Sequence, residues 1–176
     1  MADNTKAPRE GEIAIELPPA NDAGLVFIGR IHTPWKDRGQ APRNTMGTEE
    51  VCTVELDPRY VQGLAGLETC SHVILLYWLD QSRRDLIVQR PRHSKESRGT
   101  FSLRSPVRPN PIGLAVADLI SIDGNILTIR HIDCFDGTPL IDIKPYFATT
   151  DSVADARVRW RERLTGADAV SPPDDA

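Results

Sequence analysis

Cysteine is scarce in this chain, and its spacing excludes a disulfide framework. The three cysteines among 176 residues are Cys52, Cys70 and Cys134. They are odd in number and widely separated, and no Cys-x-x-Cys pair is present. Reduced thiols of this kind are typical of a cytoplasmic protein, so we expect that location. The four histidines show no ligand spacing either, and the sequence predicts no metal site.

Long apolar runs are also absent. The longest one, Val73–Leu79, has seven residues, whereas a membrane-spanning helix needs about 20. Residues 1–24 are acidic, contain prolines and have no apolar core, so they do not resemble a signal peptide. We therefore expect a protein that has no membrane segment.

Several motifs of known chemistry do not occur. The sequence contains no Gly-x-Gly-x-x-Gly, no Gly-x-x-x-x-Gly-Lys-[Ser/Thr], no Gly-x-Ser-x-Gly and no His-Glu-x-x-His. These absences remove support for a dinucleotide site, a phosphate-binding P-loop, a serine hydrolase elbow and a zinc protease helix. Any active site must therefore be built differently.

Positive charge is unevenly placed. The formal net charge is −4, yet residues 83–108, here called the basic segment, hold eight Lys or Arg and two acids. A local basic patch on an acidic body can bind phosphate without making the whole protein adhere to polyanions. A solvated, charged loop is the alternative interpretation.

Residues 98–113 are the most informative stretch. They contain three arginines and three prolines. Each proline fixes its own φ and excludes the helical region for the residue before it, so the stretch must be extended and stiff. Planar guanidinium groups suit carboxylates and phosphates. The pattern favours a binding surface, although arginines and prolines that brace a dimer interface would look similar.

Alternating and apolar runs predict a mainly β fold. We expect strands at 25–31, 50–56, 72–79, 112–122, 125–133 and 140–143. The 72–79 strand is continuously apolar, which predicts that both of its faces are covered. Asp57-Pro58 predicts the start of a short helix, and Asp123-Gly124 predicts a hairpin turn. Strands that do not alternate with helices favour a β-barrel over a doubly wound fold.

The chain is predicted to form one domain with tails. We expect a flexible tail at 1–22, a barrel domain at 23–150, a C-terminal helix at 151–165 and a second flexible tail at 166–176. The helix is predicted from apolar residues at helical spacing, and Gly166 is expected to end it. Two long irregular stretches, 32–49 and 80–98, interrupt the barrel, and loops of this length are usually functional or disordered.

Residues 99–114, Gly-Thr-Phe-Ser-Leu-Arg-Ser-Pro-Val-Arg-Pro-Asn-Pro-Ile-Gly-Leu, resemble the signature of the TsaA-like family. Other motifs of that family follow in the same order, at 28–36, 41–44, 66–72, 136–139 and 142–146. The resemblance covers roughly residues 25–147. Characterised bacterial members of the family are S-adenosylmethionine-dependent tRNA methyltransferases.

The resemblance implies a single TsaA-like β-barrel domain that works as a homodimer. It implies S-adenosyl-L-methionine as the cofactor and threonylcarbamoyladenosine 37 of the tRNA anticodon loop as the substrate, methylated on N6. The positions that match cofactor contacts are Arg43, Asn44, Asp80, Gln81, Arg104, Asp136, Gly137 and Thr138. Two of them depart from the family pattern, which usually has Gln where Asn44 stands and His where Asp80 stands.

The catalytic group remains open among three residues. The acceptor nitrogen must lose a proton, which calls for a nearby base, and Asp136, Asp142 and Tyr146 are candidates by residue type. Arg98 and Arg108 are expected to contact either RNA phosphate or a partner subunit. The alternatives are a methyltransferase for a small-molecule acceptor, which the absence of a second domain and the net charge favour, and a non-enzymatic cofactor-binding module.

Overall fold

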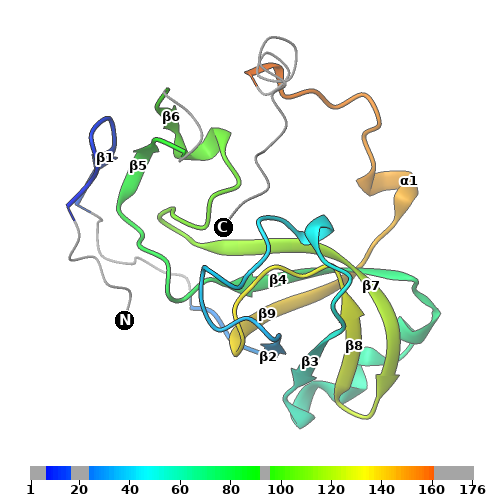
Figure 1. The fold of residues 1–176 in the computed structure, drawn as a ribbon. Coiled ribbons are helices and arrows are strands. Elements are labelled where there is room, and N and C mark those ends of the chain that lie inside the picture. The colour runs from blue at the N-terminus through cyan, green and yellow to red at the C-terminus, as the bar shows by residue number, and fades with distance from the viewer. Residues whose placement is uncertain (1–6, 17–23, 92–95, 161–176) are drawn as a thin grey trace. The chain divides into compact units, whose positions relative to one another are not determined.

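Six antiparallel strands close a barrel in the order β2-β3-β8-β7-β4-β9 (Figure 1). The computed structural model describes residues 7–16, 24–91 and 96–160. The barrel strands are β2 Gly29–His32, β3 Cys52–Leu56, β4 His72–Trp78, β7 Ile112–Asp123, β8 Ile126–Arg130 and β9 Thr138–Pro145. This architecture confirms the predicted mainly β barrel, and each of the six expected strands corresponds to one of these.

Side chains that alternate along the strands fill the barrel. On β4, Val73, Leu75 and Tyr77 are buried, while the residues between them are half-buried. Within one copy of the chain, the outer face of this strand is only partly covered, whereas both faces were predicted to be covered. An antiparallel strand in a barrel turns one face to the core and the other outward. The interior also contains fully buried Ile31, Val54, Leu127, Ile129 and Leu140.

The β7–β8 hairpin turns one residue later than expected. Asp123 pairs with Ile126, so the two turn residues are Gly124 and Asn125. Gly124 has φ 58°, a left-handed conformation that glycine adopts at no steric cost. Glycine at the first central position is typical of the hairpin turn that matches strand twist. The Asn125 side chain then donates to the Leu56 carbonyl at 2.8 Å.

The strand expected to reach residue 133 ends at Arg130. The next residue, His131, has φ 66°, which takes the backbone out of the extended region. The expected short helix does begin at Asp57-Pro58. It is the 3₁₀ helix η2 Pro58–Leu64, and the Asp57 carboxylate caps it by accepting from the Arg59 N–H at 3.0 Å. The other 3₁₀ helices are η1 Thr45–Gly47, η3 Leu67–Thr69 and η4 Thr100–Ser102.

A small second sheet lies outside the barrel, in the order β1-β5-β6 (Figure 1). Its strands are β1 Ile13–Ala14, β5 Leu86–Gln89 and β6 Arg98–Gly99. The prediction of a flexible tail at 1–22 was therefore wrong for the described residues 7–16. The prediction of an irregular stretch at 80–98 was wrong where β5 and β6 form. Strands of two to four residues show no periodicity that a sequence reading can detect.

The chain divides into two compact units, Met1–Tyr146 and Phe147–Ala176. In the second unit, α1 covers only Ala148–Asp151. The predicted helix from 151 was wrong over residues 152–158, which are not helical, and residues 161–165 lie outside the described part. Val153 and Val158 are 65% and 49% exposed. Short helices are marginal unless an apolar face packs, and these side chains are not packed.

Candidate functional site

Three long connections leave the barrel at the same end. Neighbouring strands are antiparallel all round the barrel, so β2, β8 and β4 finish where β3, β9 and β7 begin. We call this the loop end. Its connections are 33–51, 131–137 and 79–111. Seven of the eight predicted cofactor residues lie on these connections, and Thr138 is the first residue of β9.

The connections 33–51 and 131–137 are hydrogen-bonded to each other. The Asp136 N–H donates to the Trp35 carbonyl at 2.7 Å, and the Asp136 carboxylate accepts from the Thr33 N–H at 3.2 Å. The Thr33 hydroxyl donates to the Cys134 carbonyl at 3.0 Å. Two segments a hundred residues apart therefore form one surface, from which the Asp136 side chain is exposed.

Residues 135–138 form a tight turn. The Thr138 N–H donates to the Phe135 carbonyl at 3.2 Å, and Gly137 between them has φ 75°. The Gly137 carbonyl accepts from the Arg30 guanidinium at 2.8 Å. His32 lies beside the same turn, with Nδ1 at 3.4 Å from the Asp136 carboxylate. The turn is thus held rigidly against the end of β2.

Arg43 and Asn44 have different positions in their loop. Arg43 is exposed. The Asn44 side-chain oxygen accepts from the Met46 N–H at 3.0 Å and caps η1. This cap explains an amide side chain at that position without a ligand, because Asn is among the best helix-capping residues. The structure therefore leaves Arg43 as the more available group of the two.

Asp80, Gln81 and Arg104 lie on the long connection between β4 and β7. Asp80 and Gln81 are exposed in the turn that follows β4. The Leu79 N–H donates to the Pro111 carbonyl at 2.9 Å, which joins this turn to the start of β7. Arg104 is exposed, and one of its Nη atoms donates to the Leu114 carbonyl at 3.0 Å. All three side chains therefore stand at the loop end.

Arg108 is bonded to the backbone of its own loop. Its guanidinium donates to the Ser105 carbonyl at 2.8 Å and to the Leu103 carbonyl. Arg84 acts similarly: it donates to the Pro109 carbonyl at 2.6 Å and stacks over the Trp78 ring. These two arginines hold the backbone of the proline-rich segment in shape. Arg98 is paired with Glu96 at 2.6 Å.

One polar pair at this end, between buried Tyr77 and half-buried Asp133, was missed from the sequence. The Tyr77 hydroxyl donates to the Asp133 carboxylate at 3.0 Å, and Tyr77 is 3% exposed. The Tyr77 ring fits because residue 113 is glycine: a Cβ there would lie 2.1 Å from a ring carbon. The two residues are 56 positions apart, so no local motif joins them.

Burial dominates the electrostatics of this pair. It raises the pKa of the Asp133 carboxyl, and the Tyr77 hydrogen bond and the positive charge of Arg104 offset the rise in part. Burial and the Asp133 charge raise the pKa of Tyr77, so its hydroxyl stays protonated. Asp133 is thus a carboxylate of increased basicity beside the predicted cofactor arginine.

The three predicted base candidates are not together. Asp136 stands at the loop end. Asp142 lies in the middle of β9, opposite Leu76 of β4, and forms an ion pair with Lys144 at 2.6 Å. Tyr146 follows β9 at the opposite end of the barrel, where its N–H donates to the His72 carbonyl. Within one copy of the chain, Tyr146 therefore lies at the other end of the barrel from the predicted cofactor residues, and Asp142 lies between the two ends.

The described residues contain neither a metal-binding cluster nor a membrane-spanning helix. Among residues 7–16, 24–91 and 96–160, no group of three or more His, Cys, Asp or Glu side chains is arranged to hold a metal ion. Over the same ranges, no helix is both long and apolar enough to cross a bilayer.

The model of the tRNA-methyltransferase O N-terminal domain matches residues 30–152. The chain belongs to this family. It is 42% identical over 149 residues to VirR of Rhizobium radiobacter, which is named a probable S-adenosyl-L-methionine-binding protein; the match covers 85% of each chain. It is 44% identical over 92 residues to a mouse tRNA (adenine(37)-N6)-methyltransferase, covering 51% of this chain and 21% of that protein.

Solved structures of the family share the fold. The crystal structure of TrmO from Pseudomonas aeruginosa superposes with a TM-score of 0.63 at 34% identity, covering 78% of this chain and 62% of that one. A second TrmO crystal structure gives a TM-score of 0.67 at 34% identity, covering 88% and 66%. The chain therefore spans roughly two thirds of the length of these tRNA-methyltransferase O chains.

Proposed function

We propose that this protein is an S-adenosyl-L-methionine-dependent methyltransferase that acts on N6 of threonylcarbamoyladenosine 37 in tRNA. The observation that carries the proposal is the convergence of the predicted cofactor residues on the loop end of one barrel. Relatives named for S-adenosyl-L-methionine binding support the cofactor, and the mouse relative named for adenine 37 of tRNA supports the substrate.

The groups at the loop end fit this cofactor. The exposed guanidinium groups of Arg43 and Arg104 suit a carboxylate, and the exposed Asp80 carboxylate suits an amino or hydroxyl group. The rigid turn at Gly137 offers backbone groups to a nucleobase. The cofactor, when bound, supplies a methyl group already activated on a sulfonium, so the protein has chiefly to orient the acceptor and exclude water. Orientation of this kind can contribute about 7–11 kcal/mol.

Asp133 is the proton acceptor that the geometry favours. It lies on the 131–137 connection beside Asp136, its carboxylate is fixed by the Tyr77 hydroxyl, and its basicity is raised by burial. A general base works best when its pKa approaches the working pH. The Tyr77 hydroxyl, which stays protonated, holds the Asp133 carboxylate in one orientation while a proton moves to it.

Two copies of the chain are proposed to pair through the outer face of β7 and β4. Ile112, Leu114 and Val116 alternate outward on β7 and are 43%, 46% and 36% exposed. Across the ladder, β4 places Trp78, Leu76 and Ile74 opposite them. A contiguous, exposed apolar face is typical of homodimer interfaces. Because Arg104 donates to the Leu114 carbonyl, such pairing would also brace the cofactor loop.

A nucleoside assay tests the proposal. The protein is incubated with the cofactor and total tRNA, and the nucleosides are separated by mass spectrometry. We expect one methyl group to be added to threonylcarbamoyladenosine, and turnover to fall steeply with salt because RNA phosphates are contacted. Equal methylation of tRNA that lacks the threonylcarbamoyl group would reject the substrate. Turnover that is insensitive to salt would instead favour a small-molecule acceptor.

The dimer is tested separately by light scattering. Leu114→Lys places a charge on the apolar face and should give a monomer, whereas Val26→Lys, on an exposed residue before β2, should not. A wild-type protein that is monomeric at micromolar concentration would contradict this part of the proposal.

A further inference from the structure

We propose that residues 7–16, here called the strap, are a positioning element for the cofactor arginine. The strap lies before the part of the chain that the family model matches, residues 30–152. It contributes only the two residues of β1 to a sheet. The inference is that it clamps the basic segment and so fixes the arginine loop, residues 103–108, which presents Arg104. The inference rests on the proposed cofactor site.

The strap has its own internal structure. The Arg9 guanidinium donates to the Glu12 carboxylate at 2.6 Å and 3.2 Å, and the Arg9 N–H donates to the same carboxylate at 3.0 Å. The Glu12 side chain is only 5% exposed. The Arg9 hydrogen bond keeps the pKa of the Glu12 carboxyl below its usual range. Burying a carboxylate is costly unless it is paired and hydrogen-bonded, as Glu12 is. The conformation of the strap is therefore fixed by the pairing of Arg9 with Glu12.

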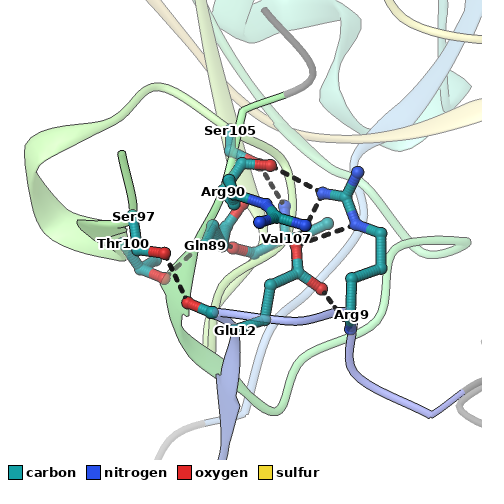
Figure 2. A network of polar contacts seen from close by, with 9 residues as sticks. Arg9, Glu12, Gln89, Arg90, Ser97, Thr100, Ser105 and Val107 are labelled. Carbon is teal, nitrogen blue, oxygen red and sulfur yellow. Dashed lines mark hydrogen bonds and ion pairs between the residues drawn. The ribbon is translucent and has the colours of Figure 1, made fainter. Parts of the chain in front are cut away.

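The strap holds the basic segment at three places, and Figure 2 shows the two that involve Arg90 and Ser97. The Arg9 guanidinium donates to the Arg90 carbonyl at 2.7 Å, and the Ser97 hydroxyl donates to the Gly11 carbonyl at 2.6 Å. The Ile15 N–H donates to the Asp85 carbonyl at 2.9 Å. Gly11 has φ 78°, and a Cβ there would lie 2.6 Å from the Ser97 oxygen. Glycine is thus required at this contact for two reasons.

Gln89 connects the clamped strand β5 to the arginine loop. Its side chain is buried and its amide donates to the Thr100 hydroxyl at 2.8 Å and to the Val107 carbonyl at 2.6 Å. The Thr100 hydroxyl in turn donates to the Leu86 carbonyl at 2.8 Å. Figure 2 shows Gln89, Thr100 and Val107 within the same polar network as Arg9 and Glu12.

These contacts give the strap a route to the site. Glu12 orients Arg9, Arg9 holds the backbone beside Gln89, and Gln89 holds Val107 of the arginine loop. A loop that is ordered before binding does not have to be ordered by the ligand, so its affinity is higher. Arg9 and Glu12 are accordingly positioning residues. Their loss should weaken cofactor binding more than it slows the chemical step.

The test compares Glu12→Gln with Glu16→Gln in the full chain. Both variants remove one negative charge from the strap, but Glu16 is exposed and only Glu12 is buried against Arg9. Titration calorimetry with S-adenosyl-L-methionine should show about tenfold weaker binding for Glu12→Gln, as expected when a charged hydrogen-bonded group is lost. Glu16→Gln should bind as the wild type does, and Glu12→Asp should recover part of the affinity.

Hydrogen exchange separates failure of this inference from failure of the proposed function. Without any cofactor, Glu12→Gln should increase amide exchange in residues 103–108 and leave exchange in β4 and β7 unchanged. This readout also serves if the wild type binds no S-adenosyl-L-methionine, an outcome that would reject the proposed function alone. If Glu12→Gln does not fold, Ser97→Ala removes the Gly11 contact more mildly and is measured in the same way.

Three results would overturn the inference. They are unchanged exchange in the arginine loop, equal cofactor affinity of Glu12→Gln and Glu16→Gln, and tighter binding or faster turnover in Glu12→Gln. The last result would mean that the strap obstructs the site.

Discussion

The barrel and the basic segment are stabilised by different kinds of contact. In the barrel, β4 and β7 pair at seven successive residues, and the core side chains are apolar. In the small sheet, β5 pairs with β1 and with β6 at two residues each. In this region, side-chain hydrogen bonds to the backbone replace a longer strand ladder. Arg9, Gln89 and Arg108 each donate to backbone carbonyls.

Because of this difference, we expect the barrel to determine the stability of the protein and the basic segment to determine its binding. A backbone ladder survives most side-chain changes on its outer face, whereas a segment held by single side chains opens when one of them is lost. Regions with few buried apolar contacts have the lowest local stability, and binding loops are drawn from such regions. We therefore expect substitutions in the barrel core to change unfolding, and substitutions in the basic segment to change binding in a protein that stays folded.

Gly113→Ala tests the barrel, and we expect it to have the largest effect, a loss of stability. A Cβ at residue 113 would lie 2.1–2.5 Å from three atoms of the Tyr77 ring. Because the ring is buried, it cannot move away, and overpacking of this kind should lower the free energy of unfolding by about 3 kcal/mol. Urea denaturation measures the change.

Gly63→Ala is the matched control. It lies in η2, and a Cβ there would meet nothing within 4 Å. It should leave the midpoint unchanged or raise it slightly, since alanine restricts the unfolded chain more than glycine does. Equal midpoints for the two variants would mean that the Tyr77 ring is not packed as described.

Arg104→Lys tests the basic segment and should affect cofactor binding. Lysine keeps the charge and loses the planar guanidinium, so its grip on a carboxylate is weaker. We expect about tenfold weaker cofactor binding by calorimetry, the size of one charged hydrogen bond, with an unchanged urea midpoint. Arg59→Lys in η2, at the opposite end of the barrel, should bind normally. A lower midpoint for Arg104→Lys would make this arginine a structural residue.

The barrel was predictable because its signals are local. Alternation along the strands, the apolar run of β4 and the glycine of the β7–β8 turn are each read within about ten residues. The C-terminal helix was wrong over residues 152–158 for the complementary reason. Val153 and Ala156 stand at helical spacing, but both are exposed, and spacing alone does not form a helix when no apolar face is buried.

The site was predictable only through the family resemblance and the topology. The role of the eight cofactor positions stays a prediction, although the strand order brings them to one end. Asp133 was missed because its partner Tyr77 is 56 positions away. The strap was missed for the same reason: Arg9 and Arg90 are 81 positions apart. Arg108 was expected to contact RNA phosphate or a partner subunit, and that contact stays a prediction. Its bonds to nearby carbonyls depend on the shape of the loop.

Asp133→Asn should separate stability from catalysis at a single position. Burial raises the pKa of Asp133, so its ionised form destabilises the folded state as the pH rises through that pKa, and only the ionised form can accept a proton. Asparagine still accepts the Tyr77 hydrogen bond but is not a base. We expect kcat to fall about 100-fold, with unfolding free energy at neutral pH equal to or above that of the wild type.

The pH profile checks this role. Wild-type kcat should decline as the pH falls through the pKa of Asp133, and Asp133→Asn should lose that decline. If the decline at low pH persists in Asp133→Asn, another group is the general base. Asp136 would be tested next, because it is the remaining candidate at the loop end.

Thiol labelling should give the smallest effect and sharpen the comparison further. Burial raises the pKa of Cys52 to about 11 and that of Cys134 to about 12. Since the thiolate is the reactive form, both buried thiols should resist iodoacetamide at pH near 8 until the protein unfolds. Cys70, which is half-buried after η3, should react first. Native-state labelling of Cys52 at the rate of Cys70, followed by mass spectrometry, would show that the barrel opens locally near β3. The rigid part of the barrel would then comprise only β4, β7 and β9.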